Sequence, residues 1–164
     1  MIIGGLLQIK KAEHKRGKQV EKLSTDTIKF QTSHAILLVS GKYVLQLRDN
    51  KPTIASAGKW SLFGGMINRN ETPLQAINRE ILEELSIKPA EYRYLWFADY
   101  HSDFLGEVVR TWFFASDVTE LWSEYKLMEG QDAGVFSLGQ IRNLNMPSVI
   151  RDTIERFHNQ VESA

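Results

Sequence analysis

The chain has 164 residues, of which 43% are hydrophobic and 24% are charged. This composition is typical of one soluble globular domain and does not indicate a membrane protein. Lysine and arginine total 20, as do aspartate and glutamate, so no overall charge attracts a nucleic acid. Cysteine is absent, which excludes disulfides, thiolate metal sites and cysteine nucleophiles.

Residues 1–31 are predicted to form a basic N-terminal arm or extension. The stretch from Gln8 to Lys22 is locally basic, as expected for a solvated surface segment. No apolar run approaches the roughly 20 residues that span a bilayer. The apolar start lacks the preceding basic residues of a secretory signal. We therefore expect a cytoplasmic protein with no membrane partner, and a single domain over residues 32–164.

Two hairpins are predicted from runs of apolar, aromatic and β-branched residues. The first covers residues 34–47, with a turn at Ser40-Gly41-Lys42. The second covers residues 92–115, with its turn at 102–106. A further short strand is predicted at 133–136.

A helix is predicted to begin after Thr72, which is followed by Pro73 at the first helical position. Gln75 completes a capping box with the threonine. The residues at helical spacing that mark the buried face are Leu74, Ile77, Ile81 and Leu85. Pro89 prevents the helix from continuing.

Two more helices are predicted near the end of the chain, a short one near Leu138 and a longer one from Pro147 to about Val161. Strands that precede segregated helices predict an α+β fold or a mixed α/β sandwich.

Three glutamates of the helix after Thr72 share one face. At about 100° per residue, Glu84 lies about 40° and Glu83 about 60° from Glu80, beside the buried stripe. Like charges at these spacings cost roughly 0.2–0.5 kcal/mol per pair. A hard divalent cation with oxygen ligands would offset this repulsion. For the helix alone, a solvated acidic face with an Arg79–Glu83 pair is the alternative.

A longer pattern separates these alternatives. Its residues are Gly65, Glu71, Arg79, Glu80, Glu83 and Glu84, with apolar Ile81 and Ile87. They reproduce the Nudix box, G-x5-E-x7-R-E-U-x-E-E-x-G-U, at every polar position. From average residue usage, the six glycine and polar matches arise by chance on the order of 10⁻⁷ per starting point. The chain thus resembles the Nudix hydrolases, and it departs from their box at Ser86, where the pattern has glycine.

The resemblance implies an α/β/α sandwich with a mixed β-sheet and a site for Mg²⁺ or Mn²⁺. Glu80 and Glu84 would be ligands, Glu83 a direct or water-mediated ligand, and Gly65 would contribute its carbonyl. Arg79 would orient or neutralise Glu83. Glutamates of the cluster would serve in catalysis.

Three residues outside the box are candidates by resemblance to MutT-like members, and Phe63 is a candidate because of its aromatic ring. Glu129, in Glu129-Gly130-Gln131, would be a further metal ligand or the general base, with a surface turn as the alternative. Asn145 in Asn145-Met146-Pro147 would read a base edge, or only start a helix. Arg48 would bind phosphate, or pair with a surface carboxylate such as Asp49. Phe63, with Trp60, Trp96 and Trp112, could stack on a base, although most strand aromatics belong to the core.

The expected function is metal-dependent hydrolysis of the phosphoanhydride bond in a nucleoside diphosphate linked to another group. The substrate would be a small-molecule nucleotide, and a homodimer is compatible with the sequence. A Nudix-fold isoprenyl diphosphate isomerase is disfavoured because the cysteine usual in that chemistry is absent. A non-catalytic nucleotide-binding sensor or regulator is the main alternative, although such domains commonly lose box carboxylates and this chain retains all of them.

Overall fold

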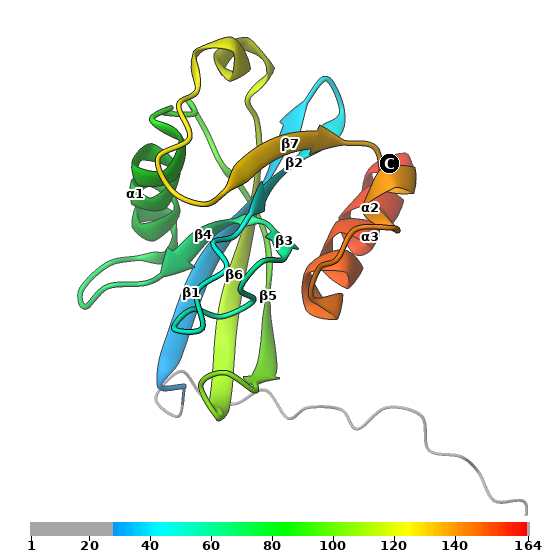
Figure 1. The fold of residues 1–164 in the computed structure, drawn as a ribbon. Helices are drawn as coiled ribbons and strands as arrows, with labels where there is room; N and C mark the ends of the chain where they lie inside the picture. The colour runs from blue at the N-terminus through cyan, green and yellow to red at the C-terminus, as the bar shows by residue number, and fades with distance from the viewer. Residues whose placement is uncertain (1–27, 164) are drawn as a thin grey trace, which may run out of the picture.

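One mixed sheet lies between two layers of helices (Figure 1). The computed structural model describes residues 28–163. Its strands are β1 (Phe30–Val39), β2 (Lys42–Leu47), β3 (Trp60–Ser61), β4 (Phe63–Met66), β5 (Arg93–Ser102), β6 (Glu107–Asp117) and β7 (Asp132–Phe136). Its helices are α1 (Pro73–Leu85), the 3-10 helix η2 (Thr119–Glu124), α2 (Leu138–Ile141) and α3 (Ser148–Glu162). Since α1 covers one face and α2 and α3 the other, the predicted α/β/α sandwich is confirmed.

The parallel pairing of β1 with β6 is what makes the sheet mixed. It runs from Phe30 opposite Val109 to Leu38 opposite Asp117. All other pairs are antiparallel: β1 with β2 and β4, β2 with β3 and β7, and β5 with β6. Both predicted hairpins and the strand before α2 are therefore confirmed, and β1 lies at the centre of the sheet.

Strand alternation along β1 divides the apolar core into two clusters. Ile36 packs into the cluster that contains Ile154 and Phe157 of α3. Ala35 and Leu37 point the other way, into the cluster beneath α1. Burying each such Leu, Ile or Phe side chain stabilises the fold by about 1.5–3 kcal/mol. The side chains that α1 contributes are Ile77, Ile81 and Leu85.

Helix α1 begins as predicted. The Thr72 hydroxyl accepts from the Gln75 backbone N–H at 3.2 Å, and the Thr72 N–H donates to Gln75 Oε1 at 2.8 Å. The prediction that Leu74 is buried is wrong, because 46% of it is exposed. Leu74 lies in the first turn, before the helix packs on the apolar cluster, and Ala76 is buried there instead.

Helix α1 ends at Ser86, whose φ of 56° and ψ of 24° are left-handed. The Ser86 N–H donates to the Leu82 carbonyl at 3.0 Å, so the serine ends the helix in the geometry usual for glycine. The next carbonyls are also bonded. Leu85 O accepts from the Lys126 N–H and Glu84 O from the Met128 N–H.

The predicted basic arm falls mostly outside the described residues. Of residues 1–31, the structure describes 28–31, and Phe30 and Gln31 already belong to β1. The 3-10 helix η2 was not predicted from the sequence. No helix within residues 28–163 is long and apolar enough to cross a membrane.

We expect Ser86→Gly to change the free energy of unfolding by less than about 1 kcal/mol, with activity retained. Relief of left-handed strain at a residue with a Cβ is worth about 1 kcal/mol. The larger unfolded-state entropy of glycine opposes it by roughly 0.4–1 kcal/mol. Urea denaturation of both proteins measures the difference. Ser86→Ala is the matched control, because it removes the hydroxyl but keeps the Cβ. A loss of about 2 kcal/mol in both variants would instead assign a structural role to the hydroxyl.

Candidate functional site

Arg79 is the centre of a network of ion pairs on the exposed side of α1. Its guanidinium binds both carboxylate oxygens of Glu71, at 2.8 and 2.9 Å. It also contacts Glu80 at 2.6 Å, Glu83 at 3.2 Å and the Met66 carbonyl at 2.9 Å. The hydrogen bonds from Arg79 and from the Asn68 N–H lower the pKa of Glu71. Arg79 thus ties the turn before α1 to two of its glutamates.

Glu84 faces the protein interior, and only 2% of it is exposed. Its Oε2 accepts from the Gly64 N–H at 2.9 Å and its Oε1 from Gln46 Nε2 at 3.2 Å. Burial raises the pKa of Glu84 to about 8, and the negative charges of Glu80 and Glu129 add to this effect. The fold therefore holds a desolvated carboxyl group in a fixed orientation beside two other carboxylates.

The paired glycines of β4 let the backbone approach both β1 and α1. Gly64 has a φ of 132°, and a Cβ there would lie 2.1 Å from the Ser33 carbonyl oxygen. A Cβ on Gly65 would lie 2.6 Å from Glu80 Oε1. Any side chain at Gly65 would thus displace this carboxylate, which is consistent with a close approach of backbone and glutamate at the predicted metal site.

The turn that carries Glu129 lies against the same cluster. Gln46 Nε2 donates to the Glu129 carbonyl at 3.1 Å as well as to Glu84. Gly130 has a φ of 89°, and a Cβ there would lie 3.0 Å from Gln46 Cγ. Burial is the main cause that raises the pKa of both Glu80 and Glu84, and the charge of Glu129 adds to this effect. Although Glu129 is far from Glu84 in sequence, the fold brings their charges together.

The donors fit a hard divalent cation in chemistry. All are oxygen atoms, which Mg²⁺ and Mn²⁺ prefer, and burial is the main cause that raises the pKa of Glu84 and of Glu80. Within residues 28–163, however, no three His, Asp or Glu side chains are already gathered as a metal cage. The reason is that Arg79 holds Glu80 and Glu83, whereas Glu84 faces Gly64 and Gln46.

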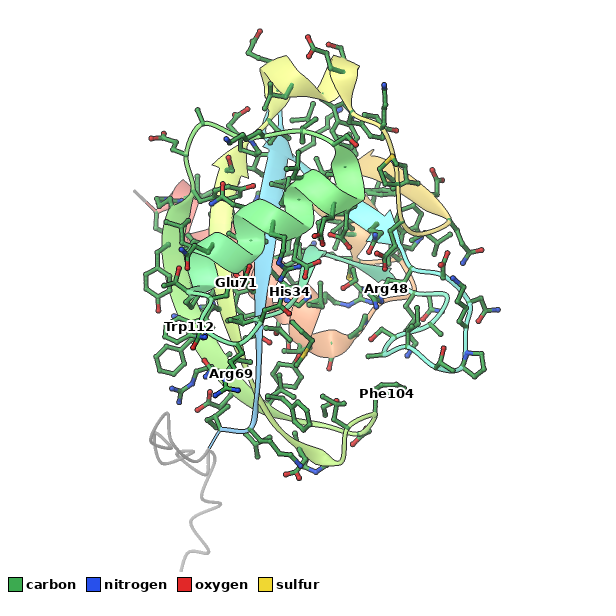
Figure 2. The ribbon with its side chains drawn as sticks, turned by 90° about the vertical axis from the view of Figure 1, so that its left-hand side faces the viewer. His34, Arg48, Arg69, Glu71, Phe104 and Trp112 are labelled. Atoms are coloured by element: carbon green, nitrogen blue, oxygen red, sulfur yellow. The ribbon has the colours of Figure 1, made fainter. Side chains whose placement is uncertain are left out.

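A cavity of about 730 Å³ adjoins this cluster and is called the large cavity here. Its wall includes Gly64 and Gly65 from β4, Arg48 and Lys59 from the loop between β2 and β3, and Tyr100, Phe104 and Leu105 from the β5–β6 hairpin. Thr32 and His34 from β1 and Ser148 and Ile150 from α3 also line it. Figure 2 labels His34, Arg48 and Phe104, which come from β1, the loop between β2 and β3, and the turn between β5 and β6.

The structure places the predicted substrate residues in different surroundings, and only one of them lines the large cavity. Arg48 lines the large cavity, where its Nε donates to the Ala55 carbonyl at 2.9 Å. Phe63 is fully buried beneath α1 and is not available to stack on a base, because strand alternation points it away from the cavity. Asn145 is exposed, and its carbonyl accepts from the Trp60 N–H at 2.9 Å. The Asn145 side chain is not part of the cavity wall.

Several residues of the site were missed from sequence. Gln46 is 1% exposed and joins Glu84 to the Glu129 turn. A polar residue within the apolar run Tyr43–Leu47 was the available signal. Tyr100 and Phe104 supply the aromatic part of the cavity wall, a role that the sequence suggested for Phe63 and the tryptophans. No local signal distinguishes them from core aromatics.

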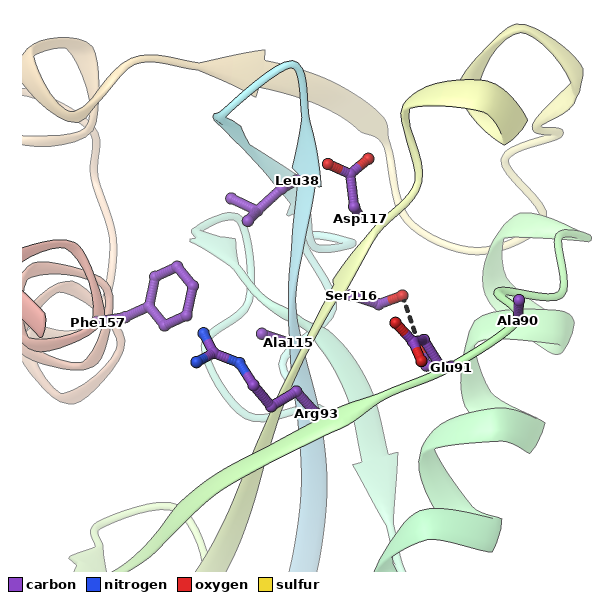
Figure 3. A pocket seen from close by; sticks show the side chains of 8 residues that line it. All are labelled: Leu38, Ala90, Glu91, Arg93, Ala115, Ser116, Asp117 and Phe157. Carbon is purple, nitrogen blue, oxygen red and sulfur yellow. Dashed lines mark hydrogen bonds between the residues drawn. The ribbon is translucent and has the colours of Figure 1, made fainter. Parts of the chain in front are cut away.

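A second cavity, of about 410 Å³, lies near the start of β5 (Figure 3). Arg93 extends toward Phe157 there, with its guanidinium carbon 5.6 Å from the ring centre. The Ser116 hydroxyl donates to the Glu91 carbonyl at 2.7 Å. The paired glycines next to Glu80 and Glu84 line the large cavity and not this one.

Comparison with known proteins gives one family. The model of the NUDIX domain matches residues 27–157. A MutT protein from Methanosarcina mazei Go1 has a similar structure, with a TM-score of 0.70, 24% identity and coverage of 84% of this chain and 98% of that one. The NUDIX domain of NrtR from Shewanella oneidensis, in complex with ADP ribose, has a TM-score of 0.68 and 18% identity, with coverage of 85% of this chain and 94% of that one. A NUDIX hydrolase from Nitrosomonas europaea has a TM-score of 0.67 and 21% identity, with coverage of 80% of this chain and 89% of that one. At these identities the structural likeness establishes the fold alone.

We expect metal-free Glu84→Gln to become more stable relative to the metal-free wild type as pH rises from about 4.5 to about 8. The folded pKa of about 8 lies above the ordinary 4.5, so ionisation of Glu84 opposes folding. This destabilisation is absent below pH 4.5 and complete above pH 8. Each tenfold weakening of the acid on folding corresponds to about 1.4 kcal/mol.

Denaturant titrations in EDTA at several pH values measure this difference. Glu83→Gln is the control and should show a smaller change, because 59% of the Glu83 side chain is exposed. Parallel stability profiles for Glu84→Gln and wild type would refute the prediction.

Proposed function

Because the chain belongs to the Nudix family, we propose that it is a metal-dependent hydrolase of a nucleoside diphosphate linked to another group, such as a nucleoside triphosphate or a nucleotide sugar. The observation that carries this proposal is the buried Glu84 carboxyl group, which lies beside Glu80 and Glu129 and accepts a hydrogen bond from Gly64 in the wall of the large cavity. A desolvated cluster of this kind costs stability, and such local costs commonly mark a functional site.

Glu80 and Glu84 would hold Mg²⁺ or Mn²⁺, with the Gly65 carbonyl, Glu83 and Glu129 as further ligands. When bound, the cation supplies positive charge that neutralises the diphosphate and activates water for attack on phosphorus. In the described structure Glu80 and Glu83 contact Arg79. Cation binding would thus require these side chains to exchange an Arg79 contact for the metal, while Glu71 keeps Arg79 in place.

The chain's own residues would accept the proton and bind the phosphate and the base. A glutamate of the cluster, Glu129 or one on α1, would accept the proton from the attacking water. Arg48 and Lys59 give the large cavity a cationic wall suited to phosphate. Tyr100 and Phe104 give it an aromatic wall suited to a base. These walls support a nucleotide as the small-molecule substrate.

A nucleotide-binding regulator is the second candidate. The similar NrtR domain binds ADP ribose, and NrtR is also known in complex with a 27mer DNA. In this chain, the contacts of Arg79 with Glu80 and Glu83 are compatible with such a role, because they leave no assembled metal cage among the described side chains. The retention of all the box carboxylates favours the hydrolase.

We expect Glu84→Gln to lower turnover by several orders of magnitude while the protein remains folded, because a metal ligand is lost together with a buried charge. The measurement is phosphate or pyrophosphate release from a panel of nucleoside triphosphates, dinucleoside polyphosphates and nucleotide sugars with Mg²⁺. Excess EDTA should abolish the wild-type rate. Full activity in EDTA, or in the variant, would rule out this mechanism. Binding of nucleotides without turnover of any panel member would favour the regulator.

Glu129→Gln tests whether the turn after η2 contributes to the site. We expect kcat or Mn²⁺ affinity to fall by about tenfold or more, with little change in melting temperature, because the Glu129 side chain is exposed and its backbone carbonyl makes the contact with Gln46. Glu124→Gln, on the exposed end of η2, is the matched control. Wild-type kinetics and metal titration for Glu129→Gln would reduce the motif to a surface turn.

A further inference from the structure

His34 contains a buried polar atom that the protein itself does not satisfy. Within residues 28–163, two buried side-chain atoms lack a hydrogen-bond partner: His34 Nδ1 and the Tyr92 hydroxyl. An unpartnered buried polar group costs about 1–3 kcal/mol, so each requires an explanation. Tyr92 packs against the cluster beneath α1, away from the large cavity, whereas His34 lines that cavity.

His34 lies between two parts of the cavity wall, the paired glycines next to the glutamates and the cationic side chain of Arg48. On β1 it lies opposite Gly64 of β4, whose N–H binds Glu84. On the other side, the positive charge of Arg48 is near enough to influence the ring. In the view of Figure 2, His34 lies between α1 and the turn that carries Phe104. A ligand that reaches the paired glycines from the large cavity therefore lies next to this ring.

The other polar groups of the cavity floor on β1 and β6 bind one another. The Thr32 and Thr111 hydroxyl oxygens are 2.6 Å apart, and Thr111 also donates to the Tyr100 hydroxyl at 3.3 Å. His34 Nδ1 has no such partner among the described residues. The imidazole therefore has a nitrogen left to bind a ligand, whereas each of these hydroxyls already has a protein partner.

The ring is in the neutral form at pH 7. Burial, followed by the charge of Arg48, lowers the pKa of His34 to about 4. A neutral imidazole carries one N–H donor and one acceptor. A half turn about the Cβ–Cγ bond exchanges Nδ1 with Cδ2, and it breaks no hydrogen bond of the protein at Nδ1. The ring can thus present a donor to the cavity without disturbing the fold.

We propose that His34 is a specificity-determining residue that donates a hydrogen bond to an oxygen of the substrate next to the scissile diphosphate. That oxygen belongs to the sugar or to the phosphate that carries the sugar. The inference rests on the proposed function, since it assigns the direction in which the nucleotide lies. The diphosphate is at Gly64 and Gly65, the bonded oxygen is at His34, and the base is toward Phe104.

The test compares His34→Gln, which retains a hydrogen-bond donor, with His34→Leu, which has a similar volume and no donor. Calorimetric titration with α,β-methylene-ADP in Mg²⁺ measures the dissociation constant. We expect His34→Leu to bind about tenfold more weakly than wild type, the effect of about 1.4 kcal/mol, and His34→Gln to bind within about threefold of wild type. His34→Leu should melt no lower than His34→Gln, since no protein hydrogen bond at Nδ1 is lost.

Methylenediphosphonate, titrated in parallel, identifies the oxygen. Weaker binding of both probes to His34→Leu assigns the bond to phosphate, and weaker binding of the nucleotide analogue alone assigns it to the sugar. Tyr92→Phe removes the other unpartnered group and should bind both probes as wild type does.

Equal affinities of wild type, His34→Gln and His34→Leu for both probes, with nucleotide hydrolysis intact, would overturn the inference alone. A comparable loss in Tyr92→Phe would also overturn it, because the effect would then come from the core. If the folded wild type bound neither probe and hydrolysed no nucleotide of the panel, the proposed function would fail, and the inference with it.

Discussion

The architecture around the glutamate helix depends on one buried carboxyl group, that of Glu84. Placing a charge in the interior costs several kcal/mol unless polar partners surround it. Here a backbone N–H of β4 and a side-chain amide of β2 provide the hydrogen bonds. Gln46 also reaches the Glu129 carbonyl, so three parts of the chain meet at one carboxyl group. Gly64 and Gly130 are small because the backbones at these contacts approach too closely for a side chain.

The two faces of the sheet carry different parts of the proposed site. α1 packs on one face with its glutamates at the border of the core, whereas α3 and His34 lie on the other. Strand β4 connects these two parts, because Gly64 binds Glu84 and also lines the large cavity. A strand with ordinary side chains at Gly64 and Gly65 would separate the acidic cluster from the space beside it.

Features with a local cause could be predicted from the sequence. The start of α1 depends on Thr72, Pro73 and Gln75, which lie within four consecutive residues, and it was found correctly. The hairpins and the last two helices followed from short-range periodicity and turn residues. Even the left-handed Ser86 could be inferred, because the family pattern has glycine at that position.

Features caused by long-range contacts could not be predicted. Gln46 binds the Glu129 carbonyl across 83 residues, and nothing in the run Tyr43–Leu47 identifies that partner. Phe63 was proposed to contact substrate because its aromatic ring could stack on a base, but the pleat of β4 points it into the core. Leu74 had the correct helical phase, yet the first turn of α1 does not bury it. The sequence indicates on which face of a helix or strand a side chain lies more readily than it indicates which residues pack against that face.

The pairing of the end of α1 with the segment after η2 has a consequence for how this scaffold can diversify. Because Leu85 and Glu84 accept from the Lys126 and Met128 N–H groups, inserting or deleting a residue there would carry Glu129 out of register with the helix. The β5–β6 turn bears no such restriction, since Phe104 and Leu105 lie at an exposed hairpin tip. Changes in turn length can therefore reshape the far wall of the cavity and leave the acidic cluster untouched. The wall of the large cavity and the acidic cluster can, in this molecule, change independently of each other.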